Sequence, residues 1–369
     1  MKKITLFLCA VLLVLAACNK HQKYTLNGHL DDAAFEGKMV YLFDAFQGTV
    51  MDSATIANGV FTFKDTVSSP KMVIIRTNEE DINYNMMMMA VLEPGKIYVD
   101  LGTDSLSGTA LNDVLHRFVM SDEALGEGLE LDYYALMLIE DEEEQKAARQ
   151  EFMKRYDEAV AEDIKLIKQY YEENKNNILG VYFINNLVES TPDQMTLEQL
   201  ESLLQDAAPE VVNHPSVQMN IDMLKKREVT KVGQPYVDID VVDFKTGNAA
   251  KLSDYVAGKI ALVDFWASWC RPCRDEILNV ANIYKEYGDK IAVISLNVWD
   301  KPESQAEAIR ELNMNWIQLT DPTKNATEAY GVNGIPQIIL IGADGTILAR
   351  DLREEAIEEA VKEALGKVM

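Results

Sequence analysis

Two cysteines separated by two residues form the pattern with the clearest chemistry in this sequence. The run Cys270-Arg271-Pro272-Cys273 follows an apolar segment that ends at Trp266. A thiolate attacks a disulfide bond and a thiol does not, so one cysteine needs a pKa below the usual value of about 8.5. A helix N-terminus supplies this, because its unpaired N–H groups and its dipole favour negative charge. We expect Cys270 at the helix start as the attacking thiolate, and Cys273 one turn later as the thiol that resolves the mixed disulfide.

The two residues between the cysteines suit this position. Pro272 is tolerated in a first helical turn, where a backbone N–H has no intrahelical partner, and Arg271 adds a nearby positive charge. The alternative is half of a zinc site, which needs a second pair of ligands. The four histidines lie at positions 21, 29, 116 and 214, all far upstream of the motif. We therefore disfavour zinc and expect neither a metal nor a cofactor.

Strands and helices alternate around the motif. The predicted strands span residues 260–266, 291–298, 337–341 and 346–350, and the predicted helices span 272–287, 302–312 and 354–365. A β–α–β unit followed by β–β–α is the order of the thioredoxin fold, here with an extra helix after the second strand. We predict an α/β thioredoxin-like domain over residues 229–369.

Upstream of this domain, one stretch of the sequence has the pattern of short strands and the next has helical spacing, so we predict a multidomain protein. Short strands are predicted at 38–43, 53–56, 60–63, 72–76 and 96–101. Asn58-Gly59 predicts a hairpin that joins 53–56 to 60–63. We expect a small β-sandwich-like domain over 24–110 and a helical region over 111–228. The helical region contains a long helix over 144–174 and a capping-box start at Thr196.

The N-terminus is typical of an export signal. Lys2 and Lys3 precede an apolar run over 4–17 that is too short for a standard spanning helix, and Cys18 follows two alanines. This arrangement resembles a bacterial lipobox, which implies cleavage after a signal peptide of residues 1–17 and lipid attachment at Cys18. Residues 18–23 are then a tether to the membrane. The alternative is an ordinary signal peptide. We expect a lipid-anchored, periplasm-facing protein of the cell envelope.

The C-terminal part resembles a known family. Residues 263–273 resemble the active-site segment of the thioredoxin superfamily, and residues 232–235 and 252–255 resemble exported reductases of the TlpA/ResA type. The resemblance implies the thioredoxin fold, a two-cysteine redox cycle and reduction of disulfides in exported proteins. It also implies electrons from a membrane thiol-electron donor.

The resemblance identifies further site residues. It implies that Ile335-Pro336 form a cis-proline loop facing the cysteines, and that Trp269 is the family's active-site tryptophan. The predicted substrate groove comprises Trp269, Arg271, Pro272, Ile335 and Pro336. Glu276 matches a glutamate of the exported reductases and Asp264 matches the buried acid of thioredoxin. A buried carboxylate with a raised pKa is suited to take the proton of Cys273. Which of the two acids does so stays open.

The upstream chain also has a weaker resemblance. Residues 59–63, 92–95 and 107–112 look like an uncharacterised β-domain that precedes thioredoxin domains in bacterial lipoproteins. That resemblance implies an arrangement of domains but no activity.

Other functions are weighed against the reductase. A peroxiredoxin-like peroxidase has a threonine three residues before its attacking cysteine, where this chain has Ala267. A third hypothesis is a lipid-anchored binding or scaffold protein with an auxiliary redox domain, in which the β and helical regions hold a client or carbohydrate. Alternatively, those regions form a homodimer or select substrates. The net charge of −25 argues against nucleic acid as a partner. For residues 86–89, all methionine, pliable packing is favoured over Cu(I) binding or an oxidant sink.

Overall fold

The computed structural model describes residues 21–77, 86–139, 141–191 and 195–368. The chain divides into two compact units, one up to Leu166 with Asn177–Leu179 and one comprising Ile167–Asn176 and the chain from Gly180. The predicted signal peptide and Cys18 lie outside the described residues. Within the described ranges, no helix is both long enough and apolar enough to cross a membrane.

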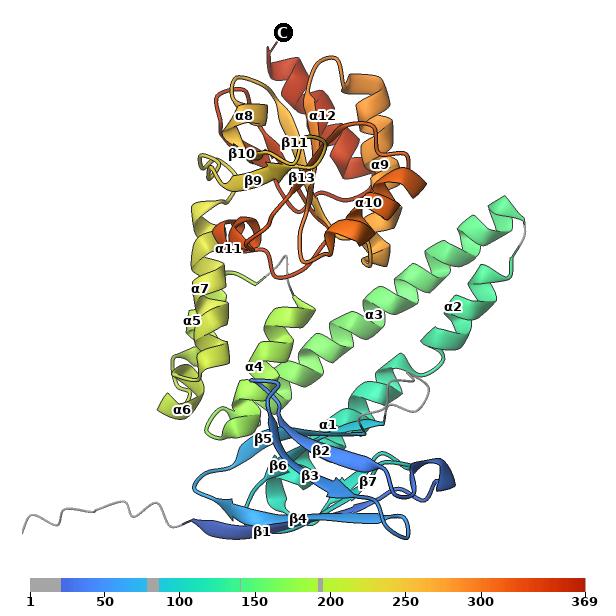
Figure 1. Cartoon of the computed structure of the whole chain (residues 1–369), viewed down its shortest axis with the longest axis vertical. Helices are drawn as coiled ribbons and strands as arrows, with labels where there is room; N and C mark the ends of the chain where they lie inside the picture. The colour runs from blue at the N-terminus through green and yellow to red at the C-terminus, as the bar shows by residue number, and fades with distance from the viewer. Residues whose placement is uncertain (1–20, 78–85, 140, 192–194, 369) are drawn as a thin grey trace, which may run out of the picture. The chain divides into compact units, whose positions relative to one another are not determined.

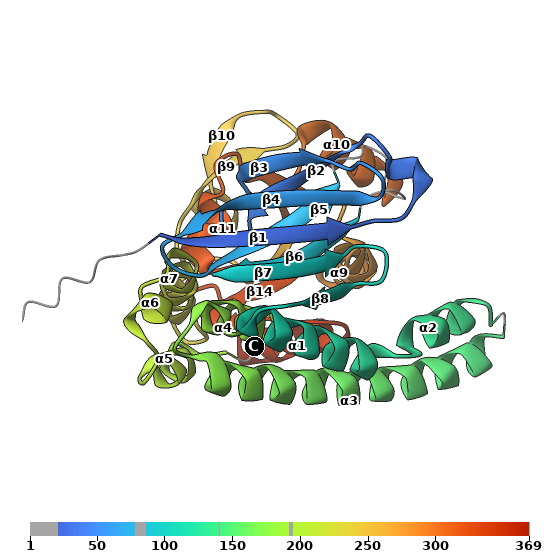
Figure 2. The ribbon, with the colours of Figure 1, turned by 90° about the horizontal axis from the view of Figure 1, so that it is seen from below.

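The first unit contains two four-stranded sheets (Figures 1 and 2). One has the order β4-β1-β7-β8 and the other the order β3-β2-β5-β6. The strands are β1 (Gln22–His29), β2 (Met39–Asp44), β3 (Val50–Thr55), β4 (Val60–Val67), β5 (Lys71–Thr77), β6 (Met87–Leu92), β7 (Gly95–Asp100) and β8 (Ser105–Ser107). Apolar side chains alternate with polar ones along them, so that Leu26, Leu42 and Phe63 are buried. The predicted β-rich N-terminal domain is confirmed.

The predicted turn at Asn58-Gly59 is confirmed, but the predicted pairing of its two flanking strands is wrong. Both turn residues have positive φ, 53° and 70°, and the Ala57 N–H donates to the Val60 carbonyl at 2.9 Å. The two flanking strands nevertheless belong to different sheets, because β3 pairs with β2 and β4 pairs with β1. The tight turn therefore passes the chain from one sheet to the other.

Polar side chains attach the first helix to the strands. The helices here are α1 (Ala110–Gly126), α2 (Leu129–Met137) and α3 (Glu142–Asn174), after a short 3-10 helix at Ala33–Phe35. The buried Asn112 amide accepts from Val91 N at 2.8 Å and donates to Val91 O at 2.7 Å. Glu93 accepts from Leu111 N at 2.7 Å. These contacts give a structural role to residues of the weaker upstream resemblance.

Three residues of the methionine run, Met87 to Met89, begin edge strand β6, and Met86 precedes it. Met87, Met88 and Met89 line a pocket of about 190 Å³ together with side chains of α1, including Leu115 and His116. Met87 is 59% exposed, so close packing in a core does not describe it.

Helices also occupy the start of the second unit. They are the end of α3, α4 (Ile178–Ser190), α5 (Leu197–Leu204), α6 (Pro209–Val212) and α7 (Pro215–Val229). The predicted capping box at Thr196 is confirmed, since its side chain and that of Gln199 each accept from the other's backbone N–H. The end of α7 is joined to the α/β domain by Arg350, which donates to Thr230 Oγ1 at 2.8 Å.

The α/β domain is built on a seven-stranded sheet of order β10-β9-β13-β12-β11-β14-β15. Its elements are β9 (Asp240–Asp243), β10 (Ala249–Lys251), α8 (Ser253–Val256), β11 (Ala261–Trp266), α9 (Arg271–Tyr287), β12 (Ala292–Asn297), α10 (Pro302–Glu311), β13 (Ile317–Thr320), α11 (Asn325–Tyr330), β14 (Gln337–Ile341), β15 (Ile347–Ala349) and α12 (Glu355–Val368). The central strands β11 and β12 are parallel and buried along their whole length. Two apolar clusters cover the sheet, one including α9 and α12 and the other including α8 and α11.

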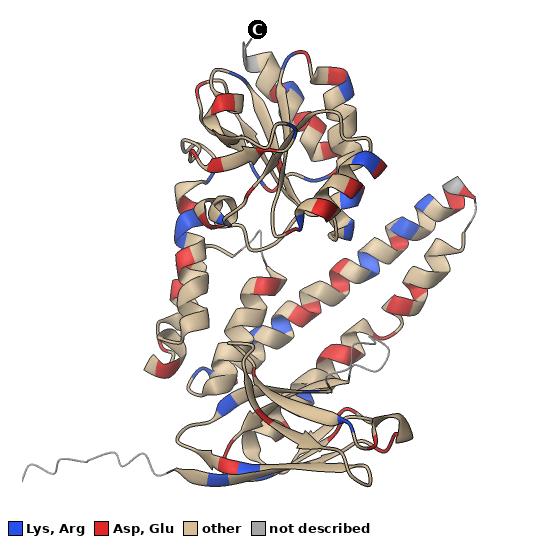
Figure 3. Cartoon of the chain, viewed as in Figure 1, with Lys and Arg blue, Asp and Glu red and all other residues tan. Residues whose placement is uncertain are grey.

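The predicted thioredoxin-like domain is confirmed, with additions. The short elements β9, β10, β13, α8 and α11 were not predicted. Acidic residues occur on helices and loops of both units and do not gather in one element (Figure 3).

Candidate active site

Cys270 and Cys273 form a disulfide at the N-terminus of α9. Cys270 is the N-cap, and its Sγ accepts from the Cys273 backbone N–H at 3.2 Å. Pro272 lies in the first turn, where its missing N–H costs no hydrogen bond. The cysteine side chains are buried, whereas Arg271 and Pro272 are exposed. The strand-to-helix arrangement expected from the sequence therefore places Cys270 at the positive end of the helix dipole.

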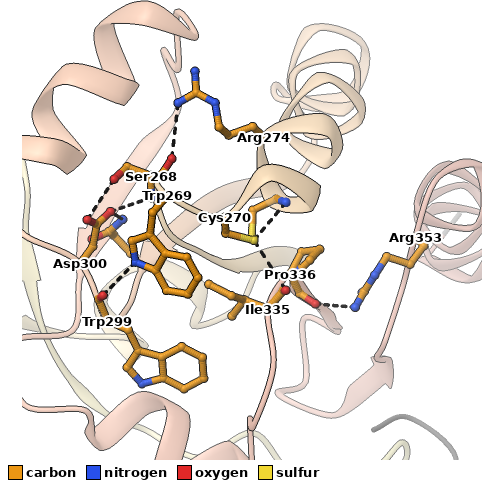
Figure 4. The surroundings of a disulfide bond; sticks show 11 residues. Ser268, Trp269, Cys270, Arg274, Trp299, Asp300, Ile335, Pro336 and Arg353 are labelled. Carbon is orange, nitrogen blue, oxygen red and sulfur yellow. Dashed lines mark hydrogen bonds between the residues drawn. A yellow bond between two sulfur atoms is a disulfide. The ribbon is translucent and has the colours of Figure 1, made fainter. Parts of the chain in front are cut away.

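The loop before Cys270 is held by Asp300. Its carboxylate accepts from Ser268 N at 2.6 Å, from Ser268 Oγ at 3.0 Å and from Asn297 Nδ2 at 3.0 Å. Partial burial opposes ionisation, but these bonds and that of Lys301 N lower the pKa of Asp300. Trp269 donates from its indole Nε1 to the Trp299 carbonyl at 3.0 Å (Figure 4). The loop that carries the tryptophan is thus fixed from the end of β12.

The Ile335–Pro336 loop faces the cysteines. Its peptide bond is cis, as the family resemblance implied. The Ile335 carbonyl oxygen lies 3.6 Å from Cys270 Sγ (Figure 4). This is a contact and not a hydrogen bond, because a disulfide sulfur carries no proton. Trp269, the residue before Cys270, is 62% exposed, so an apolar side chain next to the disulfide faces solvent.

Asp264 is buried in β11, the strand that leads to the cysteine loop, with 1% of its surface exposed. It accepts from Ser295 Oγ in β12 at 3.0 Å, and Ser295 accepts in turn from Trp316 Nε1 at 2.9 Å. Burial, together with the charge of Glu276, raises the pKa of Asp264 to about 7, against the opposing effects of the Ser295 hydrogen bond and the Arg353 charge. The carboxyl is therefore able to exchange a proton near neutral pH.

Glu276 is the second predicted acid and is also buried, in the second turn of α9. Its carboxylate accepts from Asn279 Nδ2 at 2.9 Å and from the Glu354 backbone N–H at 3.1 and 3.2 Å. The negative charge of Glu276 raises the pKa of Asp264, so the two carboxyl groups interact electrostatically. The fold thus places the cis-proline loop against Cys270, and Glu276 lies one helical turn after Cys273 on α9.

Three contributors were not expected from the sequence. Asp300 fixes the loop, Ser295 fixes Asp264, and Arg353 donates to the Pro336 carbonyl (Figure 4). Each acts across at least 17 positions of the chain, and none belongs to a local motif.

Comparisons with known proteins assign families to two parts of the chain. Residues 232–350 match the AhpC/TSA family, and residues 24–115 match a domain of unknown function, DUF4369.

Individual relatives match the C-terminal part. The thiol:disulfide interchange protein CycY of Rhizobium leguminosarum bv. viciae is 33% identical over 120 residues, which are 30% of this chain and 63% of that protein. The chain thus spans less than two thirds of CycY. The thioredoxin-like protein YneN of Bacillus subtilis (strain 168) is 30% identical over 33% of this chain and 72% of that protein. A solved thioredoxin domain of a thiol-disulfide oxidoreductase from Bacteroides vulgatus is 31% identical, covers 36% of this chain and 96% of that chain, and has a TM-score of 0.34.

Proposed function

We propose that this chain, which belongs to the thioredoxin-like thiol–disulfide oxidoreductases, reduces disulfide bonds of exported proteins. In the proposed cycle, Cys270 and Cys273 alternate between the dithiol and the disulfide. One observation carries the proposal. A cysteine pair at a helix N-terminus lies against the carbonyl of a cis-proline loop, with Cys270 Sγ 3.6 Å from Ile335 O.

The first step uses the reduced pair. The Cys270 thiolate, stabilised by the first-turn N–H groups of α9, attacks one sulfur of the client disulfide. The client S–S bond breaks, a mixed disulfide with Cys270 forms, and the second client sulfur leaves as a thiolate that takes a proton from water. The client backbone lies beside Ile335 and Pro336, where Trp269 gives it an apolar contact.

The second step uses the buried thiol. Cys273 gives its proton to a carboxylate, for which Asp264 is our first choice because its pKa is about 7. The resulting thiolate attacks the sulfur of Cys270, the bond from Cys270 to the client breaks, and the intramolecular disulfide re-forms. Two electrons have then passed from the cysteine pair to the client. A membrane thiol donor returns the pair to the dithiol.

The same proposal includes a location. Lys2, Lys3 and the apolar run up to Ala17 support export, and Cys18 supports a lipid anchor in the cell envelope. Replacing Cys18 by Ser then releases the protein from the membrane fraction while the purified chain keeps its activity. A Cys18→Ser protein that stays in the membrane fraction would remove the anchor from the proposal.

The reaction is tested with insulin as the disulfide substrate and dithiothreitol as the electron donor. The wild type should accelerate precipitation of the insulin B chain, and Cys270→Ser should not exceed the dithiothreitol control. Equal rates for wild type and Cys270→Ser would refute the proposed mechanism.

A further inference from the structure

The segment between β15 and α12 makes contacts with two separate parts of the site. Leu352 N donates to Ile338 O at 3.2 Å, just after the cis-proline loop. The Arg353 guanidinium donates to Pro336 O through Nη2 (Figure 4). It also donates to Leu352 O through Nη1. The next residue, Glu354, donates its backbone N–H to the Glu276 carboxylate. One short stretch of chain therefore holds both the substrate loop and a buried acid.

The backbone of this segment is held in an unusual conformation. Asp351 has φ of 60° and Glu354 has φ of 50°, although neither is glycine. Such conformations cost about 1–3 kcal/mol each and persist where the surrounding contacts enforce them. The positive φ values thus bracket Arg353 and fix the direction from which its side chain reaches the site.

The charge of Arg353 acts on the buried carboxyls. Both of its hydrogen bonds within the described residues go to carbonyl oxygens, which do not neutralise a guanidinium. The charged groups that act on Asp264 are Glu276 from α9 and Arg353 from this segment, and Ser295 from β12 is its uncharged donor. The same segment borders the cysteines: Glu276, which Glu354 N contacts, lies three residues after Cys273 on α9, and Ile335 O, next to Pro336, lies 3.6 Å from Cys270 Sγ. Two acids close together in a dry site need a cation before both ionise readily.

We propose that Arg353 is a positioning residue that holds the Pro336 carbonyl and carries the fixed positive charge that sets the pH range in which Cys273 is deprotonated. This inference rests on the proposed function and deepens it. In the resolving step the proton of Cys273 passes to the Asp264 carboxylate, and the thiolate displaces the client sulfur from Cys270. A guanidinium keeps its charge at every relevant pH, so it favours the ionised form of both groups throughout.

Three substitutions separate charge from hydrogen bonding. Arg353→Gln keeps a donor for Pro336 O and removes the charge, whereas Arg353→Lys keeps the charge. Arg310→Gln, at an exposed position of α10, is the matched control for loss of one positive charge. Rates of disulfide reduction are measured for each protein from pH 5.5 to 9.

Arg353→Gln should move the acid-side midpoint of the pH–rate profile up by about one pH unit. Arg353→Lys should restore most of that shift, and Arg310→Gln should leave the midpoint in place. A Gln variant that is slower by the same factor at every pH, with an unmoved midpoint, overturns the proposal, because that is the signature of a merely structural role.

A second readout does not depend on client reduction. When Cys9, Cys18 and Cys270 are all replaced by Ser, Cys273 is the one cysteine left in the sequence, and the thiolate absorbance near 240 nm reports its ionisation. Adding Arg353→Gln should raise the pH of half-ionisation, and an unchanged value overturns the inference. Failure of the wild type to reduce any disulfide, together with a shifted Cys273 titration, would instead contradict the proposed function and leave the role of Arg353 standing.

Discussion

Ser295 Oγ donates a hydrogen bond of 3.0 Å to Oδ2 of Asp264, and the two residues face each other on the adjacent parallel strands β12 and β11. The Trp316 indole donates to the same hydroxyl oxygen at 2.9 Å, which leaves the serine proton directed at the carboxyl. This bond favours the carboxylate, but burial outweighs it, so the pKa of Asp264 is raised to about 7.

The raised pKa makes folding stability depend on pH. The native state binds the Asp264 proton more tightly than the unfolded chain, so the free energy of unfolding should fall as pH rises from about 4 to about 7. Asp264→Asn removes this loss and should stabilise the oxidised protein above pH 7 by roughly 4 kcal/mol, with little effect near pH 4. Denaturant unfolding at a series of pH values measures it. The exposed Asp289→Asn serves as control, and an equal pH slope in wild type and Asp264→Asn would contradict the assignment.

Asp300 should show the opposite sign. Its pKa is lowered, so its contribution to stability is present above the unfolded value and is lost as pH falls through the folded one. Asp300→Asn should lower the free energy of unfolding at pH 7 by about 2 kcal/mol, because it weakens charge-assisted bonds to the Ser268 loop. The deficit should shrink below pH 4. Disulfide reduction should slow several-fold as Trp269 loses its fixed position, and a variant with wild-type stability at pH 7 would show that this loop is held by other contacts.

The two cysteines should respond differently to serine. In Cys273→Ser the mixed disulfide with a client has no internal thiol to resolve it, so covalent complexes should accumulate and disappear with dithiothreitol. Cys270→Ser should form few complexes, since Cys273 is only 1% exposed. Non-reducing electrophoresis and mass spectrometry of trapped species give the answer. Complexes that form equally through Cys273 would reverse the assigned roles.

Gly331 should be intolerant of a side chain. It ends α11 with φ of 60°, and a Cβ there would lie 2.5 Å from Met223 O and 2.7 Å from Arg227 N in α7. Gly331→Ala should therefore destabilise the protein by about 2 kcal/mol or more, seen as a lower Tm. Gly366→Ala in α12, with nothing within 4 Å, is the control and should be neutral or slightly stabilising. A neutral Gly331→Ala would mean that α7 and α11 separate readily.

Much of the site could be predicted from local patterns. An apolar strand, a CxxC motif and a helical period place Cys270 at an N-cap, because each of these signals lies within a few residues of the next. The cis bond before Pro336 and the two acids came from the resemblance to a family. The turn at Asn58-Gly59 was also predicted, since it depends on two residues that tolerate positive φ.

The rest depends on contacts between distant residues. Arg353 lies 17 positions from Pro336, and Ser268 lies 32 positions from Asp300. A charged residue in a loop has no periodicity that would reveal such a partner. The same holds for the strands after Asn58-Gly59, because the turn geometry does not say which sheet each strand joins. Likewise, no local pattern reveals that Thr230, the C-cap of α7, accepts a hydrogen bond from Arg350, 120 positions further along the chain.

The reduction potential of the Cys270–Cys273 pair distinguishes a reductase of disulfides from a donor of disulfides. Equilibration with glutathione buffers at pH 7, followed by alkylation of free thiols, gives the value without any assumption about the client. A disulfide reductase needs a reducing pair, so we expect a potential near that of thioredoxin, about −270 mV. A potential near about −120 mV, typical of a strong oxidant, would contradict it and identify the protein as a donor of disulfides.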